Sequence, residues 1–194
     1  PRGGPSDPAE LRYGLYRADG RAKPAAATVR AAFTGSVPAS FNNGFERGAG
    51  RRGPPAAWRQ HGARNFRVAW DTRVRRSGRA SARLASAGGH ATGPGAISVL
   101  VPEPPTPGAR YVVTAWGRGA GAIGRSRLVL AWYDASGREL VRATSAPLLA
   151  GGSWGRLVAR GTAPADAAYA RVRLESERSR GTVWFDDVAL GRRR

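Results

Sequence analysis

Short segments in which apolar and polar residues alternate follow one another along most of this chain, and turn-forming residues close each of them. Leu128, Leu130 and Trp132 alternate before the turn 134–137, whose final glycine suits a left-handed backbone, and 139–144 returns after it. Repeated strands and turns with no helices between them predict an all-β fold, an antiparallel β-sandwich. The candidate strands are 66–70, 81–86, 96–101, 110–116, 127–133, 139–144, 154–160, 169–175 and 182–190.

The same alternation predicts which aromatic side chains leave the core. Tyr111 and Val113 share one face of their strand, so Trp116 is expected on the other, and Tyr133 is expected to point outward as well. Sugars bind by stacking their C–H faces on aromatic rings while polar side chains meet their hydroxyls, although core packing also explains most aromatic residues. The candidates for such contacts are Trp116, Tyr133, Trp70, Arg118, Arg173 and Glu175.

Two carboxylates mark the ends of the strand-rich region. Alternation places Trp184, Asp186, Val188 and Leu190 on one face of the last strand, so a carboxylate shares an apolar side. Glu46 becomes its neighbour if the first and last segments lie side by side. The pair could hold a calcium ion together with backbone carbonyls, Asp186 could bind backbone amides instead, or its side chain could be exposed.

Composition excludes several functions. The 194 residues contain no cysteine, which rules out disulfides, thiolate catalysis and cysteine-bound zinc. No apolar run is long enough to cross a membrane. The net charge of +19 comes almost entirely from arginines that are dispersed along the chain, so specific nucleic-acid binding is not expected.

Motifs for catalysis are also missing. The glycines of 119–124 have the spacing of a dinucleotide-binding loop, but an alternating strand follows them where a helix should begin, so a flexible loop between strands is expected. His61 and His90 are far apart and show no metal-ligand spacing. We therefore expect no enzymatic activity from this chain by itself.

The order of several short motifs resembles that of the jelly-roll carbohydrate-binding modules of polysaccharide-degrading enzymes. These motifs are NGFE at 43–46, PAAW at 55–58, RSGRAS at 76–81, YDASG at 133–137 and WFDDV at 184–188. The resemblance implies a galactose-binding-like β-sandwich, a structural calcium ion near Glu46 and Asp186, and non-catalytic binding of a polysaccharide or oligosaccharide. It also implies a secreted protein. A structural spacer without a ligand and an electrostatic binder of an anionic polymer are the alternatives.

The N-terminal segment has a resemblance of its own. Residues 13–26 look like the last strand and helix of a (β/α)₈ glycoside hydrolase barrel. This implies a catalytic domain upstream in the same polypeptide, so we expect the chain to be part of a longer protein. The predicted organisation is a strand-helix appendage at 1–36 that is a barrel remnant, a carbohydrate-binding sandwich at 37–191 and a basic tail at 192–194.

Overall fold

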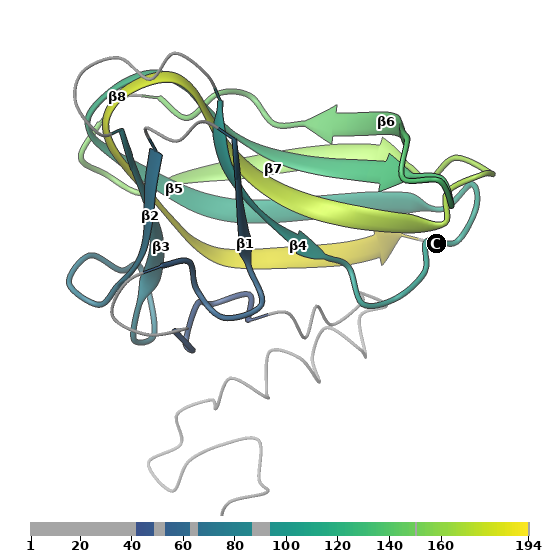
Figure 1. Ribbon diagram of the computed structural model, residues 1–194, viewed down its shortest axis with the longest axis horizontal. Coiled ribbons are helices and arrows are strands. Elements are labelled where there is room, and N and C mark those ends of the chain that lie inside the picture. Colours follow the sequence, from purple (N-terminus) through teal and green to yellow (C-terminus); the bar gives the residue numbers. More distant parts are fainter. Residues whose placement is uncertain (1–41, 49–52, 63–65, 87–93, 150, 194) are drawn as a thin grey trace, which may run out of the picture.

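The computed structural model describes residues 42–48, 53–62, 66–86, 94–149 and 151–193 (Figure 1). The predicted appendage at 1–36 and His90 lie outside the described residues. No helix among the described residues is long and apolar enough to span a membrane.

The described segments form β-strands whose positions agree closely with the alternating segments of the sequence. Strand β1, which contains His61, was not predicted. Two pairs of predicted strands are joined into the long strands β5 and β8. The strands are β1 (Arg59–Gly62), β2 (Phe66–Asp71), β3 (Ser81–Ser86), β4 (Gly95–Leu100), β5 (Arg110–Tyr133), β6 (Glu139–Thr144), β7 (Gly155–Thr162) and β8 (Tyr169–Arg193).

Strands β5 and β8 pair with each other and pass together through both layers of a sandwich. Residues 125–133 of β5 pair with 169–177 of β8, and with β4, β1 and β6 these halves form the first sheet. Residues 110–120 of β5 pair with 182–193 of β8, and with β3, β2 and β7 they form the second sheet. All of these pairings are antiparallel. Figure 1 shows both long strands turning back at one end of the molecule.

Glycines make this double bend possible. Gly121 and Gly124 have φ angles of 56° and 121°, and Gly181 on β8 has a φ of 83°, which L-residues with a side chain rarely adopt. A Cβ on Gly181 would collide with the carbonyl oxygen of Gly121. As predicted, no helix follows the glycine motif at 119–124. The motif forms a bend inside one continuous strand, however, rather than the expected loop between strands.

The core lies between the two sheets and confirms the predicted alternation. Leu128, Leu130 and Trp132 are buried, and so are Val172 and Leu174, their neighbours on β8. The turn after Trp132 has Gly137 at a φ of 90°, the left-handed conformation expected from the sequence. The sequence therefore predicted this hairpin and its inward face correctly.

The prediction for the last strand was wrong in one respect. Thr114 pairs with Ala189 and Trp116 pairs with Asp186, so β8 carries one extra residue between these positions. Asp187 has a φ of 49°, which marks a β-bulge. The bulge changes which residues face the core, so Val188 and Leu190 point inward while Asp186 shares the outer side with Trp116. Asp186 does not share an apolar face with Val188.

Candidate functional site

Five of the six residues predicted to contact a ligand divide between the two outer surfaces of the sandwich. Tyr133 on β5 and Arg173 and Glu175 on β8 lie on the outer face of the first sheet. Trp116 and Arg118 lie on the outer face of the second sheet. The two groups are separated because β5 changes sheets between residues 118 and 133, so one strand places its side chains on opposite sides of the molecule.

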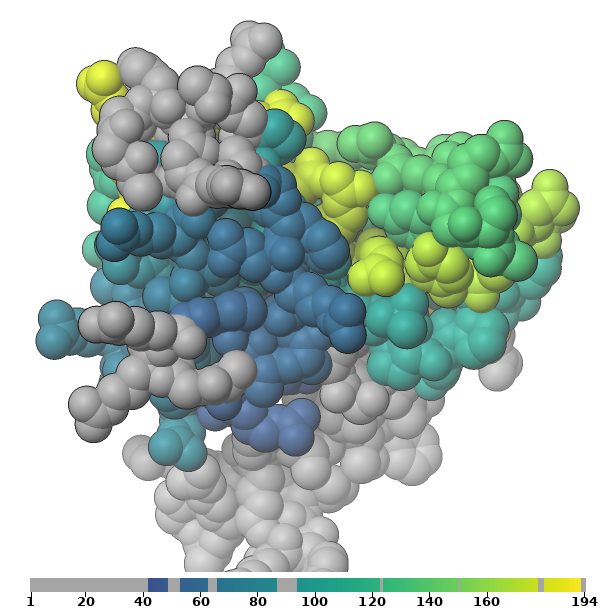
Figure 2. All heavy atoms as spheres, viewed as in Figure 1, coloured from purple at the N-terminus to yellow at the C-terminus, as the bar shows by residue number. Residues whose placement is uncertain are grey.

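The outer face of the first sheet carries a cluster of charged and aromatic side chains from β5, β6 and β8, which we call the arginine–tyrosine face. In the space-filling view, the first half of β8 (lime) is exposed between the earlier part of the chain (blue) and the β6 region (green) (Figure 2). The face consists of Tyr133, Glu139, Arg142, Tyr169, Arg171, Arg173 and Glu175.

Arg173 is the centre of the hydrogen-bond network on this face. Its Nη1 donates to Glu139 Oε2 at 2.8 Å and to the Tyr133 hydroxyl at 3.2 Å, and its Nη2 forms an ion pair with Glu175 Oε1 at 2.5 Å. The Tyr133 hydroxyl donates to Glu139 Oε2 at 3.1 Å, and Arg142 Nε contacts Glu139 Oε1 at 2.6 Å. These contacts fix the side chains in one arrangement.

Burial and charge change the proton affinities of this network. Burial of the Arg173 guanidinium opposes its charge, but Glu175, the Tyr133 hydroxyl and Glu139 outweigh this and raise the pKa of Arg173. Burial is also the main reason that the pKa of Tyr133 is raised, against the effect of Arg173. Arg173 therefore stays charged and the Tyr133 hydroxyl stays a donor at neutral pH.

Two tyrosines stand side by side at one end of the face. Tyr133 and Tyr169 are in register on neighbouring strands, and their rings are nearly parallel with centroids 5.0 Å apart and planes inclined by 8°. The Arg171 guanidinium lies 5.7 Å from the centre of the Tyr169 ring. Both tyrosines are half-buried, so part of each ring remains accessible.

The outer face of the second sheet has a different construction. The Arg76 guanidinium lies 3.9 Å from the centre of the Trp116 ring, and Asp187 Oδ2 accepts a hydrogen bond from Arg76 Nη1 at 2.6 Å. Arg118 is in register with Trp184, whose indole nitrogen donates to Asp71 Oδ2 at 2.9 Å. One face of the Trp116 ring is therefore covered by a residue from the β2–β3 turn.

Trp70, the remaining candidate, contacts the N-terminal segment. Its indole nitrogen donates to the carbonyl oxygen of Phe45 at 2.6 Å, and the ring lies so close to Gly48 that a Cβ at that position would approach it to 2.6 Å. It also packs against the hydrophobic core. These contacts attach the segment 42–48 to the edge of the second sheet.

The two end carboxylates, Glu46 and Asp186, both bind the turn between β2 and β3. Asp186 is fully buried. Its Oδ2 accepts hydrogen bonds from the backbone nitrogens of Arg76 at 2.8 Å and Ser77 at 3.2 Å, and its Oδ1 accepts one from Asp187 at 2.8 Å. Glu46 Oε2 accepts a hydrogen bond from the Arg79 nitrogen at 2.9 Å.

The segments themselves are joined as well. The Val188 nitrogen donates to the Asn43 carbonyl at 2.8 Å, so the first described segment lies against the last strand. Burial, and then the neighbouring Asp187 charge, raise the pKa of Asp186 from 3.8 to about 6 despite the three amide donors. We call this arrangement of Glu46, Asp186 and the turn 76–79 the carboxylate clasp.

A calcium ion would have to use the acceptor sites that remain. A carboxylate offers about four such sites, and the amides use three on Asp186 and one on Glu46. Within the described ranges, no group of three or more His, Cys, Asp or Glu side chains could hold a metal ion. The two carboxylates therefore fit a calcium ion only if backbone carbonyls complete its coordination shell.

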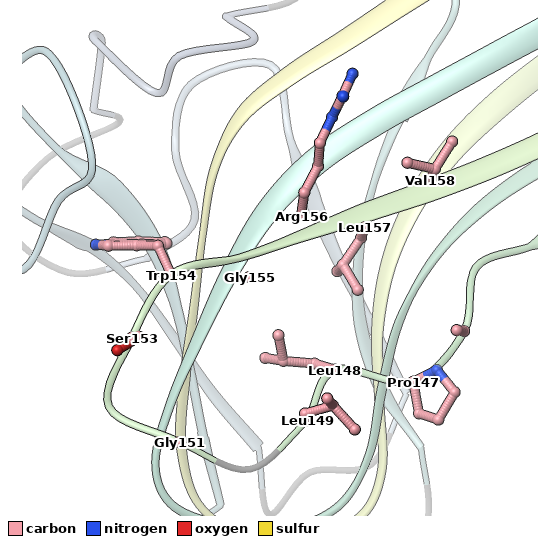
Figure 3. Close-up of a pocket in the computed structure, with 11 residues that line it drawn as sticks. Pro147, Leu148, Leu149, Gly151, Ser153, Trp154, Gly155, Arg156, Leu157 and Val158 are labelled. Carbon is pink, nitrogen blue, oxygen red and sulfur yellow. The ribbon is translucent and has the colours of Figure 1, made fainter.

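An apolar groove of about 670 Å³ lies beside the β6–β7 connection. Figure 3 shows Leu148 and Leu157 pointing toward each other, while Arg156 points away from them. Trp154 immediately precedes β7, and Leu149 is 84% exposed. The lining offers few polar groups and therefore little means of orienting a ligand.

The sequence matches no known family and no curated protein, but solved structures share the fold. A cyclase from Fischerella sp. TAU superimposes with a TM-score of 0.65 at 17% identity, over 81% of this chain and 97% of the cyclase. The CBM22-1 xylan-binding domain of Paenibacillus barcinonensis Xyn10C gives 0.58 at 11% identity, over 77% of this chain and 91% of that domain.

The enzymatically active domain of tailspike protein 4 from bacteriophage CBA120 gives a TM-score of 0.62 at 14% identity. The match covers 80% of this chain but only 21% of the tailspike domain. At these identities the likeness shows the fold alone. It confirms the predicted β-sandwich of the type found in jelly-roll carbohydrate-binding modules.

Sequence reasoning missed Glu139, Arg142 and Tyr169 as members of the arginine–tyrosine face. The signal for Glu139 was present, because the turn 134–137 fixes the hairpin register and brings Glu139 opposite Tyr133. Tyr169 is different. Its place beside Tyr133 depends on the pairing of β5 with β8, which are far apart in the sequence.

Proposed function

We propose that this chain is a non-catalytic carbohydrate-binding module and that the arginine–tyrosine face holds the glycan. The observation that carries the proposal is the network around Arg173, in which a charged donor, two carboxylates and two tyrosines lie on one open sheet face. Hydroxyl groups of a sugar need both donors and acceptors, and aromatic rings contact its C–H faces. Side chains already held in place lose little conformational entropy on binding.

The similar structures support this proposal. The Paenibacillus barcinonensis domain is described as xylan-binding, and a further similar structure, at a TM-score of 0.55 and 15% identity, is a xylanase fragment in complex with xylohexaose. The Tyr133 hydroxyl is held by the Glu139 carboxylate, but the raised pKa of Tyr133 keeps this hydroxyl protonated, so binding is favoured over catalysis. We further propose that the module is secreted and directs an attached glycoside hydrolase to its substrate, which raises the local enzyme concentration.

Affinity electrophoresis tests the proposal. Gels containing xylan, mixed-linkage β-glucan or another soluble glycan should retard the protein, and Arg173→Ala should abolish the retardation because it removes the group that connects Tyr133, Glu139 and Glu175. Arg160→Ala is the matched control, since Arg160 is an exposed arginine on β7 of the other sheet. Migration that no glycan in a broad panel changes would refute the proposed function.

The same gels identify which surface binds. Tyr133→Ala removes a ring from the arginine–tyrosine face, whereas Trp116→Ala removes one from the second sheet, where Arg76 already covers it. We expect Tyr133→Ala to weaken binding by at least tenfold, on the scale of one stacked ring and its hydrogen bonds. If only Trp116→Ala weakened binding, the glycan would bind to the outer face of the second sheet and not to the arginine–tyrosine face.

We also propose that a structural calcium ion binds at the carboxylate clasp through Glu46 and Asp186. Each side chain keeps acceptor sites that the backbone amides do not use. Calcium should raise the melting temperature of the wild type and a chelator should lower it. Asp186→Ala should remove both responses. If neither calcium nor a chelator changed the melting temperature of the wild type, calcium binding at the carboxylate clasp would be refuted.

A further inference from the structure

We infer that the arginine–tyrosine face selects an acidic glycan, in which a carboxylate or sulfate on the sugar contacts Arg171 while the sugar ring packs beside Tyr169. This inference rests on the proposed function and names the class of glycan. It does not follow from the net charge of the chain, because the arginines are dispersed along the whole sequence. It follows from the positions of the arginine and glutamate side chains on this face.

Positive charge exceeds negative charge on the outer face of the first sheet. Among the described residues, six arginines point outward from β1, β5, β6 and β8, and three glutamates lie among them. Glu139 contacts Arg142 and Arg173, Glu175 contacts Arg173, and Glu177 is in register with Arg125. The six arginines are Arg59, Arg125, Arg127, Arg142, Arg171 and Arg173.

Arg171 is one of the arginines on this face that remain available. Among the described residues it has no ion-pair partner, and its guanidinium contacts the Tyr169 ring. It is in register with Leu100 on β4, a leucine that is 49% exposed. An aliphatic side chain, an aromatic ring and a guanidinium therefore meet in one place. A sugar acid has the matching groups, because it combines an apolar C–H face with an anionic substituent.

The residue next to Arg171 on β5 is small. Ala131 is in register with Arg171 on one side and with Arg142 on the other, so an arginine residue flanks it on each neighbouring strand. Neighbouring strands are about 4.8 Å apart, which places the backbones of the two arginines about 10 Å apart. Two guanidinium groups at this spacing can both reach one anionic group between them.

The pKa of His61 is independent evidence for a positive electrostatic potential on this face. Its pKa is lowered by burial first and then by the charges of Arg171, Arg173 and Arg59. It lies on β1, and its Nε2 is 2.7 Å from the Ser98 hydroxyl. The arginines therefore act on a neighbouring side chain as they would act on a ligand.

A glycan fits the face better than a nucleic acid does. The glutamates on the face accept hydrogen bonds from hydroxyl groups, which are frequent on sugars. They would repel a polymer that carries a phosphate on every unit. The negative charges of the ligand should therefore be spaced along a hydroxyl-rich chain.

The test compares polymers that differ only in charge. Polygalacturonate is paired with its methyl ester and dextran sulfate with dextran, and binding is measured by isothermal titration calorimetry. At least one acidic polymer should bind at least tenfold more tightly than its neutral counterpart, and which pair shows the difference separates carboxylate from sulfate recognition. Arg171→Gln should lose about tenfold in affinity for that polymer, the loss expected for one charge-assisted hydrogen bond. Arg160→Gln, which removes the same charge from the opposite sheet, should change affinity less than twofold.

Each other outcome also decides the question. Equal binding to charged and neutral partners, with Arg171→Gln unaffected, would overturn the acidic-glycan inference and leave the proposed function standing. Binding to none of these polymers or to a neutral glycan panel would overturn both. Equal losses in Arg171→Gln and Arg160→Gln would show attraction by overall charge and overturn the inference. Tighter binding to double-stranded DNA than to every acidic glycan would replace it with nucleic-acid binding.

Discussion

The buried carboxylate of Asp186 makes the stability of this domain depend on pH in an unusual direction. Most native carboxylates have a lowered pKa and lose their stabilising effect in acid. Burial and the Asp187 charge raise the pKa of Asp186 from 3.8 to about 6. This group therefore stabilises the fold most below about pH 4 and loses that contribution as the pH rises through about 6.

The size of the effect follows from these two pKa values. Between about pH 7.5 and about pH 4.5, protonation of Asp186 should add about 2 kcal/mol to the free energy of unfolding. Other carboxylates also titrate in this range, so the wild type alone does not isolate the effect. Asp186→Asn keeps the shape of the side chain and cannot ionise, so the difference between the two proteins cancels the other groups.

Urea unfolding followed by tryptophan fluorescence measures this difference, with a chelator present to exclude calcium. The wild type should gain about 2 kcal/mol relative to Asp186→Asn when the pH is lowered over that interval. A difference that stays constant or moves the other way would refute the reasoning, because the three amide donors would then outweigh burial. Added calcium should also suppress the gain, since a bound cation keeps the carboxylate ionised.

Two other substitutions test the contacts of the turn between β2 and β3. Gly78→Ala should lower the free energy of unfolding by about 2 kcal/mol, because Gly78 has a φ of 58° and the new Cβ would collide with Glu46 Oε1. The control Gly108→Ala should lower it by only about 1 kcal/mol, because Gly108 has a φ of 71° but no atom lies within 4 Å of the new Cβ. Equal losses in urea unfolding would show that the Glu46 contact is unimportant. Arg76→Ala should expose the Trp116 ring and increase quenching of tryptophan fluorescence by acrylamide, while Arg75→Ala, whose guanidinium contacts the Thr72 carbonyl, should not. Unchanged quenching in Arg76→Ala would contradict the stacked arrangement.

The sequence predicted most of the strands because period-two alternation is a local property. Leu128, Leu130 and Trp132 were assigned to the core, and Tyr133 and Trp116 to the outside, without any knowledge of the strands beside them. The hairpin turn was equally local, since its glycine is required by a positive φ. These features needed only neighbouring residues to be recognised.

Features that depend on distant segments were not predictable in the same way. Glycines inside a strand pattern indicate a loop or a bend equally well, so the alternation could not show that Trp116 and Tyr133 belong to opposite sheets. The bulge at Asp187 shifts the alternation of β8, and a positive φ at an aspartate has no reliable sequence signal. The burial of Asp186 depends on a turn about 110 residues earlier in the chain. These interactions required the three-dimensional structure.

The central position of β8 in both sheets has a consequence for how the protein is made. Its first half pairs with β4 and its second half with β3, while β5 accompanies it along its whole length. Neither sheet has a complete interior until residues 169–193 are available. During synthesis, the strands made earlier must therefore wait with their apolar faces uncovered until residues 169–193 have left the ribosome. Emergence of β8, rather than formation of any earlier hairpin, should be the event that commits this domain to its native structure.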